Sequence, residues 1–480
     1  MHRTRYTSSY KSGRRGQGRQ FWAHLILISI VADVLFAQRV ILSFSTGGRG
    51  NLLVLDVWLP VLAALLLIGV GTSRGVGLLH ADASSLFWWP YVLLTIALPI
   101  LAVLVQNYPV RNLYSSVSGF VALAFFILGA WIASADEDVL KLVQVYAWIA
   151  VVGECLFAVI DYLNKTGLYK TWIGEFLLHW NVASEDTLGQ YSALTWRCVG
   201  TFVSPNELGF WSVLAFWLSA LLPLRGILRF TAIIAALMTL VLSQSRGSLF
   251  ALFGTIAVWV AYLALSRDRS LARARDITYF SVICGFLALA WTAGLLSDIH
   301  ITVASEFSFI ERFQSGLQVL TQGAGADRNA EARVEAWRRA LAFYYVHPLG
   351  TWASPGLLFR HYIDNDYVRT FVQGTPVYLT AVLLALYGGF RRIVRSGIAS
   401  RITALFSVAI AIDALSAHPF MYPAIGVYWL SMGYDLAAER SASRSAERSA
   451  FHVRRQVLAG HECLAELPHQ QINRSVRAPC

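Results

Sequence analysis

Long apolar runs, separated by short polar segments, fill most of this chain. Because a helix needs roughly 20 apolar residues to cross the hydrocarbon core of a bilayer, each run is interpreted as a membrane-spanning helix. The runs predict twelve spans, at 21–38, 52–70, 86–105, 113–133, 139–160, 206–222, 229–245, 247–265, 277–296, 371–390, 402–417 and 420–437. His418, Pro419 and Pro423 interrupt the last two, so eleven spans or a re-entrant segment are alternatives. The pattern therefore predicts an all-α, polytopic membrane bundle.

The composition also indicates a membrane protein. Hydrophobic residues make up 56% of the chain and charged residues 14%, whereas a soluble globular domain carries about 25% charge. The 16 Trp, 20 Tyr and 27 Phe fit as well, because amphipathic aromatic side chains settle at bilayer interfaces. The net charge of +11 does not indicate a nucleic-acid partner, because the basic residues lie in short loops between the apolar runs.

The positions of Lys and Arg predict the orientation, because cytoplasmic loops carry an excess of both. Basic residues occur in the N-terminal tail 1–20, in every second loop through most of the chain, and in the Arg/Ser-rich tail 438–480. Both ends are thus predicted to be cytoplasmic, and both tails are expected to be flexible and to contact anionic lipid headgroups. Two long external loops follow, at 161–205 and 297–370, and loops of this length are usually functional or disordered.

The first candidate segment ends the loop 161–205 and enters the sixth predicted span. Ser204 and Pro205 read as the N-cap and first residue of a helix, which is also a purely structural explanation. The functional interpretation is that the N–H groups of this helix start, together with Arg197, face an anion near the outer interface.

The second candidate is Arg246, in the external Ser-Arg-Gly turn between two apolar runs. An Arg in this place opposes the bias of basic residues toward the cytoplasm and is costly if it faces lipid. Arg246 is therefore predicted to be a functional residue. The alternative is that its side chain extends to the lipid headgroups without a further role.

The third candidate is the loop 297–370. An amphipathic helix is predicted from Asp327 to Val346, with an apolar stripe of Val334, Trp337, Leu341 and Tyr344 or Tyr345. Arg333 borders this stripe, and Pro348 ends the helix after His347. A cluster of acids, His and Arg then runs from His361 to Arg369, just before the next apolar run.

Four motifs in this order resemble the O-antigen ligase and polymerase family. They are Gly-Thr-Phe-x-x-Pro-Asn-x-x-Gly at 200–209, Ser-Arg-Gly at 245–247, Arg-x-x-x-Trp at 333–337 followed by His-Pro-Leu-Gly at 347–350, and Asp-Asn-x-Tyr at 364–367 before a Gly-containing span. The resemblance covers about 195–390, and the flanking spans agree only in hydrophobicity and number.

The resemblance implies a GT-C-like membrane glycosyltransferase over 21–437 in a bacterial inner membrane, whose donor is a glycan on undecaprenyl pyrophosphate. By this resemblance Arg246 and Arg333 hold the pyrophosphate, for which guanidinium is suited because it stays charged and binds phosphate oxygens bidentately. The leaving group is already good, so no metal or other cofactor is expected. The remaining residues expected to contact substrate are Arg197, Asn206, Trp337, His361, Asn365 and Tyr367.

The chain departs from the family at one functional position. Ligases of the family usually carry His-Asn where this chain has Asp364-Asn365, and that His is the proposed base for the acceptor hydroxyl. A carboxylate can also act as a base, so Asp364 is expected to take this role, with His361 as a second candidate. The departure favours a polymerase of exopolysaccharide or O-antigen repeat units over a ligase. A transporter of lipid-linked sugars is a third hypothesis, and by family analogy the partners are a flippase and a chain-length regulator.

Overall fold

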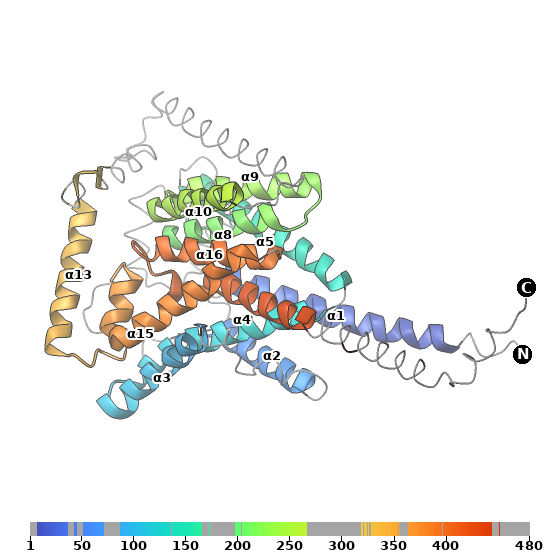
Figure 1. The fold of residues 1–480 in the computed structure, drawn as a ribbon, viewed down its shortest axis with the longest axis horizontal. Helices are drawn as coiled ribbons and strands as arrows, with labels where there is room; N and C mark the ends of the chain where they lie inside the picture. Colours follow the sequence, from blue (N-terminus) through green and yellow to red (C-terminus); the bar gives the residue numbers. More distant parts are fainter. Residues whose placement is uncertain are drawn as a thin grey trace, which may run out of the picture.

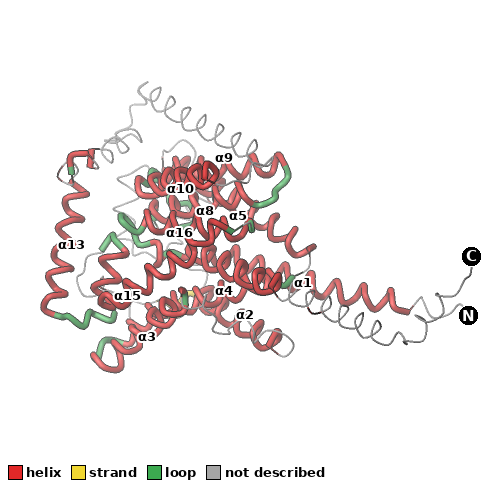
Figure 2. Tube along the Cα trace, in the orientation of Figure 1, coloured by secondary structure: helices red, strands yellow, loops and turns green. Residues whose placement is uncertain are grey.

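The fold is almost entirely helical (Figures 1 and 2). The computed structural model describes residues 7–36, 43–45, 51–71, 87–135, 137–165, 197–202, 204–265, 328–353, 363–395 and 397–443, and a few single positions between them. The two strands, β1 (Ser43–Ser45) and β2 (Asn51–Leu53), form one small antiparallel pair in which Phe44 lies opposite Leu52.

The helices follow the apolar runs of the sequence. The α-helices are α1 (Thr7–Phe36), α2 (Val54–Gly71), α3 (Trp89–Gln106), α4 (Val117–Ala133), α5 (Glu137–Lys165), α8 (Pro205–Leu221), α9 (Gly226–Ser243), α10 (Arg246–Leu265), α13 (Arg328–Val346), α15 (Asp366–Phe390) and α16 (Ile398–Asp413). The 3₁₀ helices are η3 (Val110–Ser116), η5 (Arg391–Val394), η6 (Pro419–Met421) and η7 (Pro423–Ile425), and residues 426–443 form a last α-helix.

Five helical segments in the described part of the chain are long and apolar enough to cross a membrane. They are Trp89–Gln106, Glu137–Lys165, Gly226–Ser243, Arg246–Leu265 and Asp366–Val394, and Phe21–Phe36 and Val117–Ala133 are shorter apolar helices. This composition is that of a multi-pass membrane protein. The predicted span 277–296 lies outside the described residues.

One predicted property and two predicted boundaries are wrong. The N-terminal tail was expected to be flexible, but it is helical from Thr7 onward as part of α1. The predicted span 402–417 ends at Asp413, and the predicted span 420–437 begins with η6 and η7 before helix 426–443. Pro419 and Pro423 explain the last difference, because proline lacks the N–H that a continuous α-helix needs and is tolerated only in its first turn.

Helix α8 forms the centre of the bundle. It packs against α5, α9, α10 and α16 (Figure 1), and 15 of its 17 residues are buried. Apolar residues such as Phe210, Leu214 and Trp217 occur on all of its sides, and a helix that is apolar all round is stable only when it is enclosed.

The bundle has two chemically different ends. At one end α8, α10 and α15 begin, α9 and α16 finish, and α13 stands beside the start of α15 (Figure 1). We call this the α13 end. At the opposite end, Arg392 in η5 bonds to Asp435 in helix 426–443, and Ser400 at the start of α16 bonds to the same carboxylate. The candidate residues that the structure describes belong to the α13 end.

Candidate functional site at the α13 end

A short segment, residues 197–204, leads into α8 and is held by two buried acids of α5. Asp161 accepts hydrogen bonds from the N–H groups of Val199 and Gly200, at 2.7 and 3.3 Å. Glu154 accepts from the N–H and the hydroxyl of Thr201, at 2.9 and 2.5 Å. Gly200 has a φ of 57°, and a Cβ there would collide with Glu154. The acids thus replace the hydrogen bonds that this non-helical backbone would otherwise lack.

Arg197 is fixed at the start of this segment. Its carbonyl accepts a hydrogen bond from Lys165 at 2.7 Å, its Nε donates to the carbonyl of Ser243 at 3.1 Å, and its Nη2 donates to Oδ1 of Asn206 at 2.7 Å. As predicted, Ser204 caps α8 by accepting from the N–H of Glu207, and Pro205 is the first helical residue. The guanidinium of Arg197 therefore ties the end of α9 to the start of α8.

Serines connect this start of α8 to α10 and α16. The hydroxyls of Ser245 and Ser248 lie 2.9 Å apart, and Ser248 donates to Oδ1 of Asp413 at 3.2 Å. A Cβ on Gly247 would collide with Ser416 and contact Asp413. Arg246, the first residue of α10, is half-buried between these serines. The small residues let α10 approach the end of α16 closely, and Arg246 lies at the start of the same helix.

Four hydrogen bonds fasten the start of α15 to the turn that follows α16. The N–H of Asp366 donates to the carbonyls of Ala414 and Ala417, at 3.0 and 3.2 Å. Nδ2 of Asn365 donates to the carbonyl of Leu415 at 2.9 Å, and Oδ2 of Asp366 accepts from the N–H of Phe420 at 2.9 Å. We call residues 414–420 the α16 turn. The predicted cluster before α15 is thus held against a segment about fifty residues further along the chain.

The side chains of Asn365 and Tyr367 make hydrogen bonds at the start of α15. Oδ1 of Asn365 caps α15 by accepting from the N–H of Val368, and the hydroxyl of Tyr367 donates to the carbonyl of Ala411, at 2.9 and 2.8 Å respectively. In this state both side chains shape the site through hydrogen bonds within the protein. His361 lies outside the described residues.

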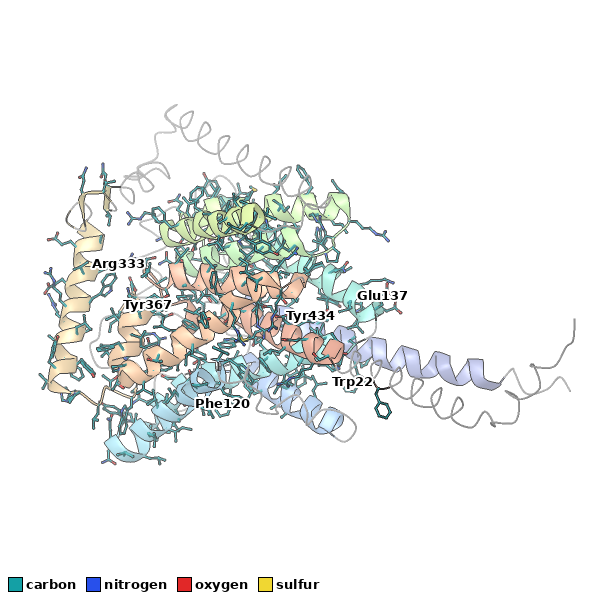
Figure 3. All side chains as sticks on the ribbon, in the orientation of Figure 1. Trp22, Phe120, Glu137, Arg333, Tyr367 and Tyr434 are labelled. Carbon is teal, nitrogen blue, oxygen red and sulfur yellow. The ribbon has the colours of Figure 1, made fainter. Side chains whose placement is uncertain are left out.

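Arg333 and Asp364 form an ion pair across the site. Nε of Arg333 lies 3.2 Å from Oδ2 of Asp364, and both side chains are about one third exposed, at 33% and 32%. Arg333 lies on the side of α13 that faces α15 (Figure 3). The predicted phosphate ligand and the predicted base are therefore in contact, although 31 positions separate them in the sequence.

Helix α13 rests on α15 through a small apolar cluster. Ala340, Ile363 and Val372 are buried, and Trp337 and Phe343 pack on them. The predicted helix is confirmed, but its predicted stripe is partly wrong, because Leu341 and Tyr345 are exposed. Of the two tyrosines, Tyr344 contacts α15, with its ring centroid 4.5 Å from that of Phe371. The apolar face is rotated by about one residue, with Ala340 buried in place of Leu341.

Among the buried polar atoms that have no hydrogen-bond partner within the described part of the chain are Nε1 of Trp337 and Oδ2 of Asp413. Buried polar atoms are nearly always paired, so an unpaired donor and an unpaired acceptor beside the Arg333–Asp364 pair are groups that a polar ligand can satisfy.

His418 was not among the predicted site residues, and the structure brings it into the site. It belongs to the α16 turn, its ring contacts Tyr422, and the charges of Asp364, Asp366, Arg333 and Arg369 act on it. Burial lowers the pKa of His418 below its ordinary value, so the imidazole is neutral at neutral pH. The only sign of this in the sequence is a histidine between two apolar runs, next to a proline.

Helix α15 is interrupted about two turns after its start at the site. Gly374 and Thr375 have non-helical dihedral angles, with φ at 64° for Thr375, and Pro376 follows. The carbonyls of Val372 and Gln373 accept instead from the N–H groups of Thr351 and Trp352, at 3.0 and 2.8 Å. The predicted span at 371–390 lies within the apolar segment Asp366–Val394, which is long enough to cross a membrane. Its helix is interrupted, which was not predicted, because a proline disfavours the helical conformation in the residue before it.

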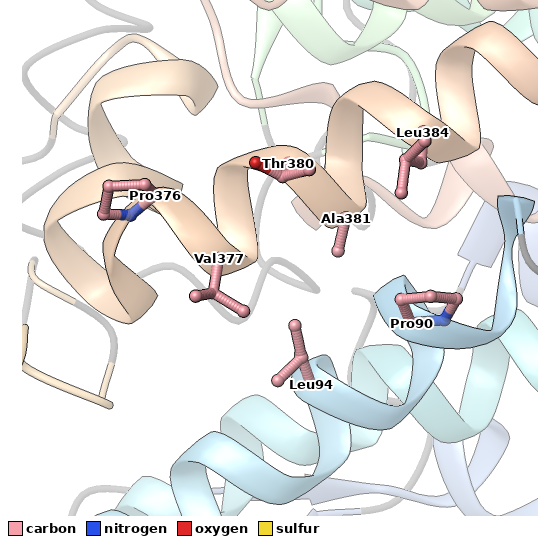
Figure 4. Close-up of a pocket in the computed structure, with 7 residues that line it drawn as sticks. All are labelled: Pro90, Leu94, Pro376, Val377, Thr380, Ala381 and Leu384. Carbon is pink, nitrogen blue, oxygen red and sulfur yellow. The ribbon is translucent and has the colours of Figure 1, made fainter.

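An apolar groove begins at this break. Its volume is about 350 Å³, and it lies between α3 and α15 (Figure 4). It is lined by Pro90, Leu94, Pro376, Val377, Thr380, Ala381 and Leu384. None of these lining residues is charged, so the groove differs in chemistry from the start of α15, where Asp366 and Arg369 form an ion pair.

A comparison of the chain with protein families and with curated proteins gives no match.

Proposed function

We propose that this protein is a polysaccharide polymerase that joins repeat units carried on undecaprenyl pyrophosphate. The growing glycan on its lipid is the donor, and a sugar hydroxyl of a new lipid-linked repeat is the acceptor. In this proposal Arg333 and Arg246 bind the pyrophosphate, and Asp364 accepts the proton of the attacking hydroxyl. The bundle is a GT-C-like inner-membrane enzyme with twelve spans, cytoplasmic ends and a periplasmic α13 end.

The observation that carries the proposal is the ion pair between Arg333 and Asp364. Displacement at an anomeric carbon needs a cation beside the leaving pyrophosphate and a base beside the incoming hydroxyl, only a few ångströms apart. The pair supplies both groups at that separation, on a surface that is partly open to solvent. Neither group requires a metal to perform its part.

The reaction balances through these groups. The acceptor oxygen forms a bond to the anomeric carbon, and its proton passes to the carboxylate of Asp364. The bond from that carbon to the phosphate oxygen breaks, and undecaprenyl pyrophosphate leaves with the electron pair. Positive charge from guanidinium groups stabilises the charge that develops on the leaving oxygen.

The ion pair also predicts an order of binding. While Arg333 is bonded to Asp364, the guanidinium occupies the carboxylate that the proposal assigns as the base. When the donor arrives, its pyrophosphate competes for Arg333 and releases Asp364. The base thus becomes available only when the donor is bound, which limits wasteful transfer to water.

The test uses purified full-length protein and a synthetic lipid-pyrophosphate repeat unit, with chain length read on a gel. Wild type is expected to produce a ladder, and Arg333→Ala and Asp364→Asn are expected to lose it. Arg338→Ala is the matched control, because Arg338 lies on the same helix with its side chain 76% exposed. A wild-type protein that yields no ladder from the repeat unit of its own host would contradict the polymerase. A strain that lacks the gene and accumulates long unattached polymer instead of single lipid-linked repeats indicates the ligase.

One observation favours the transporter as a second candidate. A candidate span, α15, is broken at Gly374 and Thr375, and it holds the buried ion pair between Asp366 and Arg369, at 2.6 Å. Broken helices and buried charges occur at the substrate sites of many transporters. Flipping of a lipid-linked sugar by an Arg333→Ala, Asp364→Ala double variant at the wild-type rate would favour this function over the polymerase.

A further inference from the structure

We propose that His418 receives the proton that Asp364 takes from the acceptor hydroxyl. This inference rests on the proposed function, because it needs Asp364 to act on a hydroxyl beside a bound pyrophosphate. His418 acts through Asp364 and is therefore a positioning and relay residue.

The first argument is geometric. The α16 turn, which contains His418, is bonded to Asn365 and Asp366 at four points, on both sides of the histidine in the sequence. The ring of His418 contacts Tyr422, with ring centroids 5.1 Å apart. The imidazole thus belongs to a turn that is bonded to the start of α15, and α15 begins two residues beyond Asp364.

The second argument concerns basicity. An ordinary Asp has a pKa of about 3.9 and an ordinary His one of about 6.5. A carboxylate can remove a proton during the reaction, but it holds that proton poorly at neutral pH. A neutral imidazole beside it is a better final acceptor, because proton transfer is most efficient when the pKa is near the working pH.

The third argument concerns the charges around His418. Two carboxylates, Asp364 and Asp366, raise the pKa of the ring, and two guanidinium groups, Arg369 and Arg333, lower it. With burial added, the imidazole stays neutral in the absence of substrate. A bound pyrophosphate adds negative charge beside Arg333, which favours the imidazolium form. The proton affinity of His418 therefore rises at the moment the reaction releases a proton.

The steps conserve protons. The hydroxyl proton moves to Asp364, Asp364 passes it to the neutral His418, and the imidazolium releases it to water after the pyrophosphate leaves. Each group returns to its starting state, so one proton is released for each bond formed.

The first measurement is the pH dependence of turnover by wild type, His418→Gln and His418→Ala. The variants are expected to lower kcat by about 10²-fold or more, within the usual range for a lost acid–base group, while KM for the lipid donor stays within about twofold. In wild type, part of the change of kcat with pH should follow the protonation of the His418 imidazole. This part of the pH profile should be absent from both variants. Free imidazole in the buffer should restore part of the activity of His418→Ala but not of His418→Gln, whose side chain fills the space. An unchanged pH profile, or the absence of rescue by imidazole, overturns the relay.

The second measurement does not depend on a glycan. Inorganic pyrophosphate is titrated into the full-length protein near pH 7, and proton uptake is measured by calorimetry in buffers of different ionisation enthalpy. Wild type should take up more protons on binding than His418→Gln. His347→Gln should behave as wild type, because His347 is exposed at the end of α13. Equal uptake by wild type and His418→Gln, or no binding of pyrophosphate, overturns the inference. If wild type forms no polymer but still shows the extra proton uptake, the proposed polymerase function is wrong. The link between anion binding and protonation of His418 is then still supported.

Discussion

At the scale of single residues, Arg333 and Asp364 contribute little to stability. Both side chains are about one third exposed, and ion pairs with this exposure are worth about 0–1 kcal/mol because water and salt screen them. Asp364→Asn is therefore expected to lower the free energy of unfolding by less than about 1 kcal/mol while abolishing transfer. Thermal unfolding in detergent and the ladder assay, run on the same preparation, check both parts. A large fall in melting temperature would show that Asp364 is structural.

The pairing at Arg369 is different in kind. Arg369 and Asp366 are nearly or fully buried, with side chains 9% and 0% exposed, and Arg369 also donates to Gln373. Such a pair is weak evidence for stability, but the loss of one partner leaves a buried charge uncompensated. This pair lies within the first turn of α15, and Asp366 also accepts a hydrogen bond from Phe420 of the α16 turn. In the proposal, the partly exposed pair of Arg333 and Asp364 exchanges its partner for a phosphate.

At the scale of elements, the break in α15 depends on one glycine in another segment. Gly350 has a φ of 78°, and a Cβ there would lie 2.7 and 2.9 Å from the carbonyls of Gln373 and Val372. Gly350→Val is therefore expected to separate the turn 350–353 from α15, to leave those carbonyls unpaired, and to destabilise the protein by about 2 kcal/mol or more. Thermal unfolding measures the effect.

Gly226→Ala is the control for this prediction. Gly226 begins α9, and a Cβ there would meet no atom within 4 Å. Replacement at such a position should be neutral or stabilise by up to about 1 kcal/mol, because it reduces the entropy of the unfolded chain. A Gly350→Val variant that is as stable as Gly226→Ala would show that the turn does not support the broken helix.

Local patterns in the sequence predicted several elements and missed the contacts between them. The cap at Ser204, the start of α8 at Pro205 and the end of α13 before His347 follow from neighbouring residues and are confirmed. The Gly374-Thr375-Pro376 sequence also contained a local signal for the break in α15, which the apolar run concealed. In contrast, the approach of His418 to Asp364 and Asp366 depends on how α15 and α16 pack, and no periodicity of either segment encodes it.

At the scale of the whole molecule, Arg333 differs from the arginines at the opposite end of the bundle. At the opposite end, Arg392 and Arg395 bond to Asp435 and Glu439, and Arg391 lies over the ring of Phe87. At the α13 end, Arg333 is paired with the one carboxylate that the proposal assigns to catalysis. The arginines at the opposite end connect helices through bonds within the protein. Arg333, in its partly exposed pair, can instead exchange Asp364 for an anionic ligand.

The orientation of the bundle provides the last prediction. Five arginines lie at or near helix termini at the end opposite to α13, namely Arg225, Arg391, Arg392, Arg395 and Arg401. Since basic residues are retained on the cytoplasmic side, the α13 end should face outward. In a variant without the native cysteines, His347→Cys should react with a membrane-impermeant maleimide added to intact cells. Ile398→Cys, 45% exposed at the start of α16, should react only after the membrane is opened. The reverse labelling pattern would place the Arg333–Asp364 pair at the cytoplasmic face. The pair could then not catalyse polymerisation outside the inner membrane, and the proposed function would be wrong.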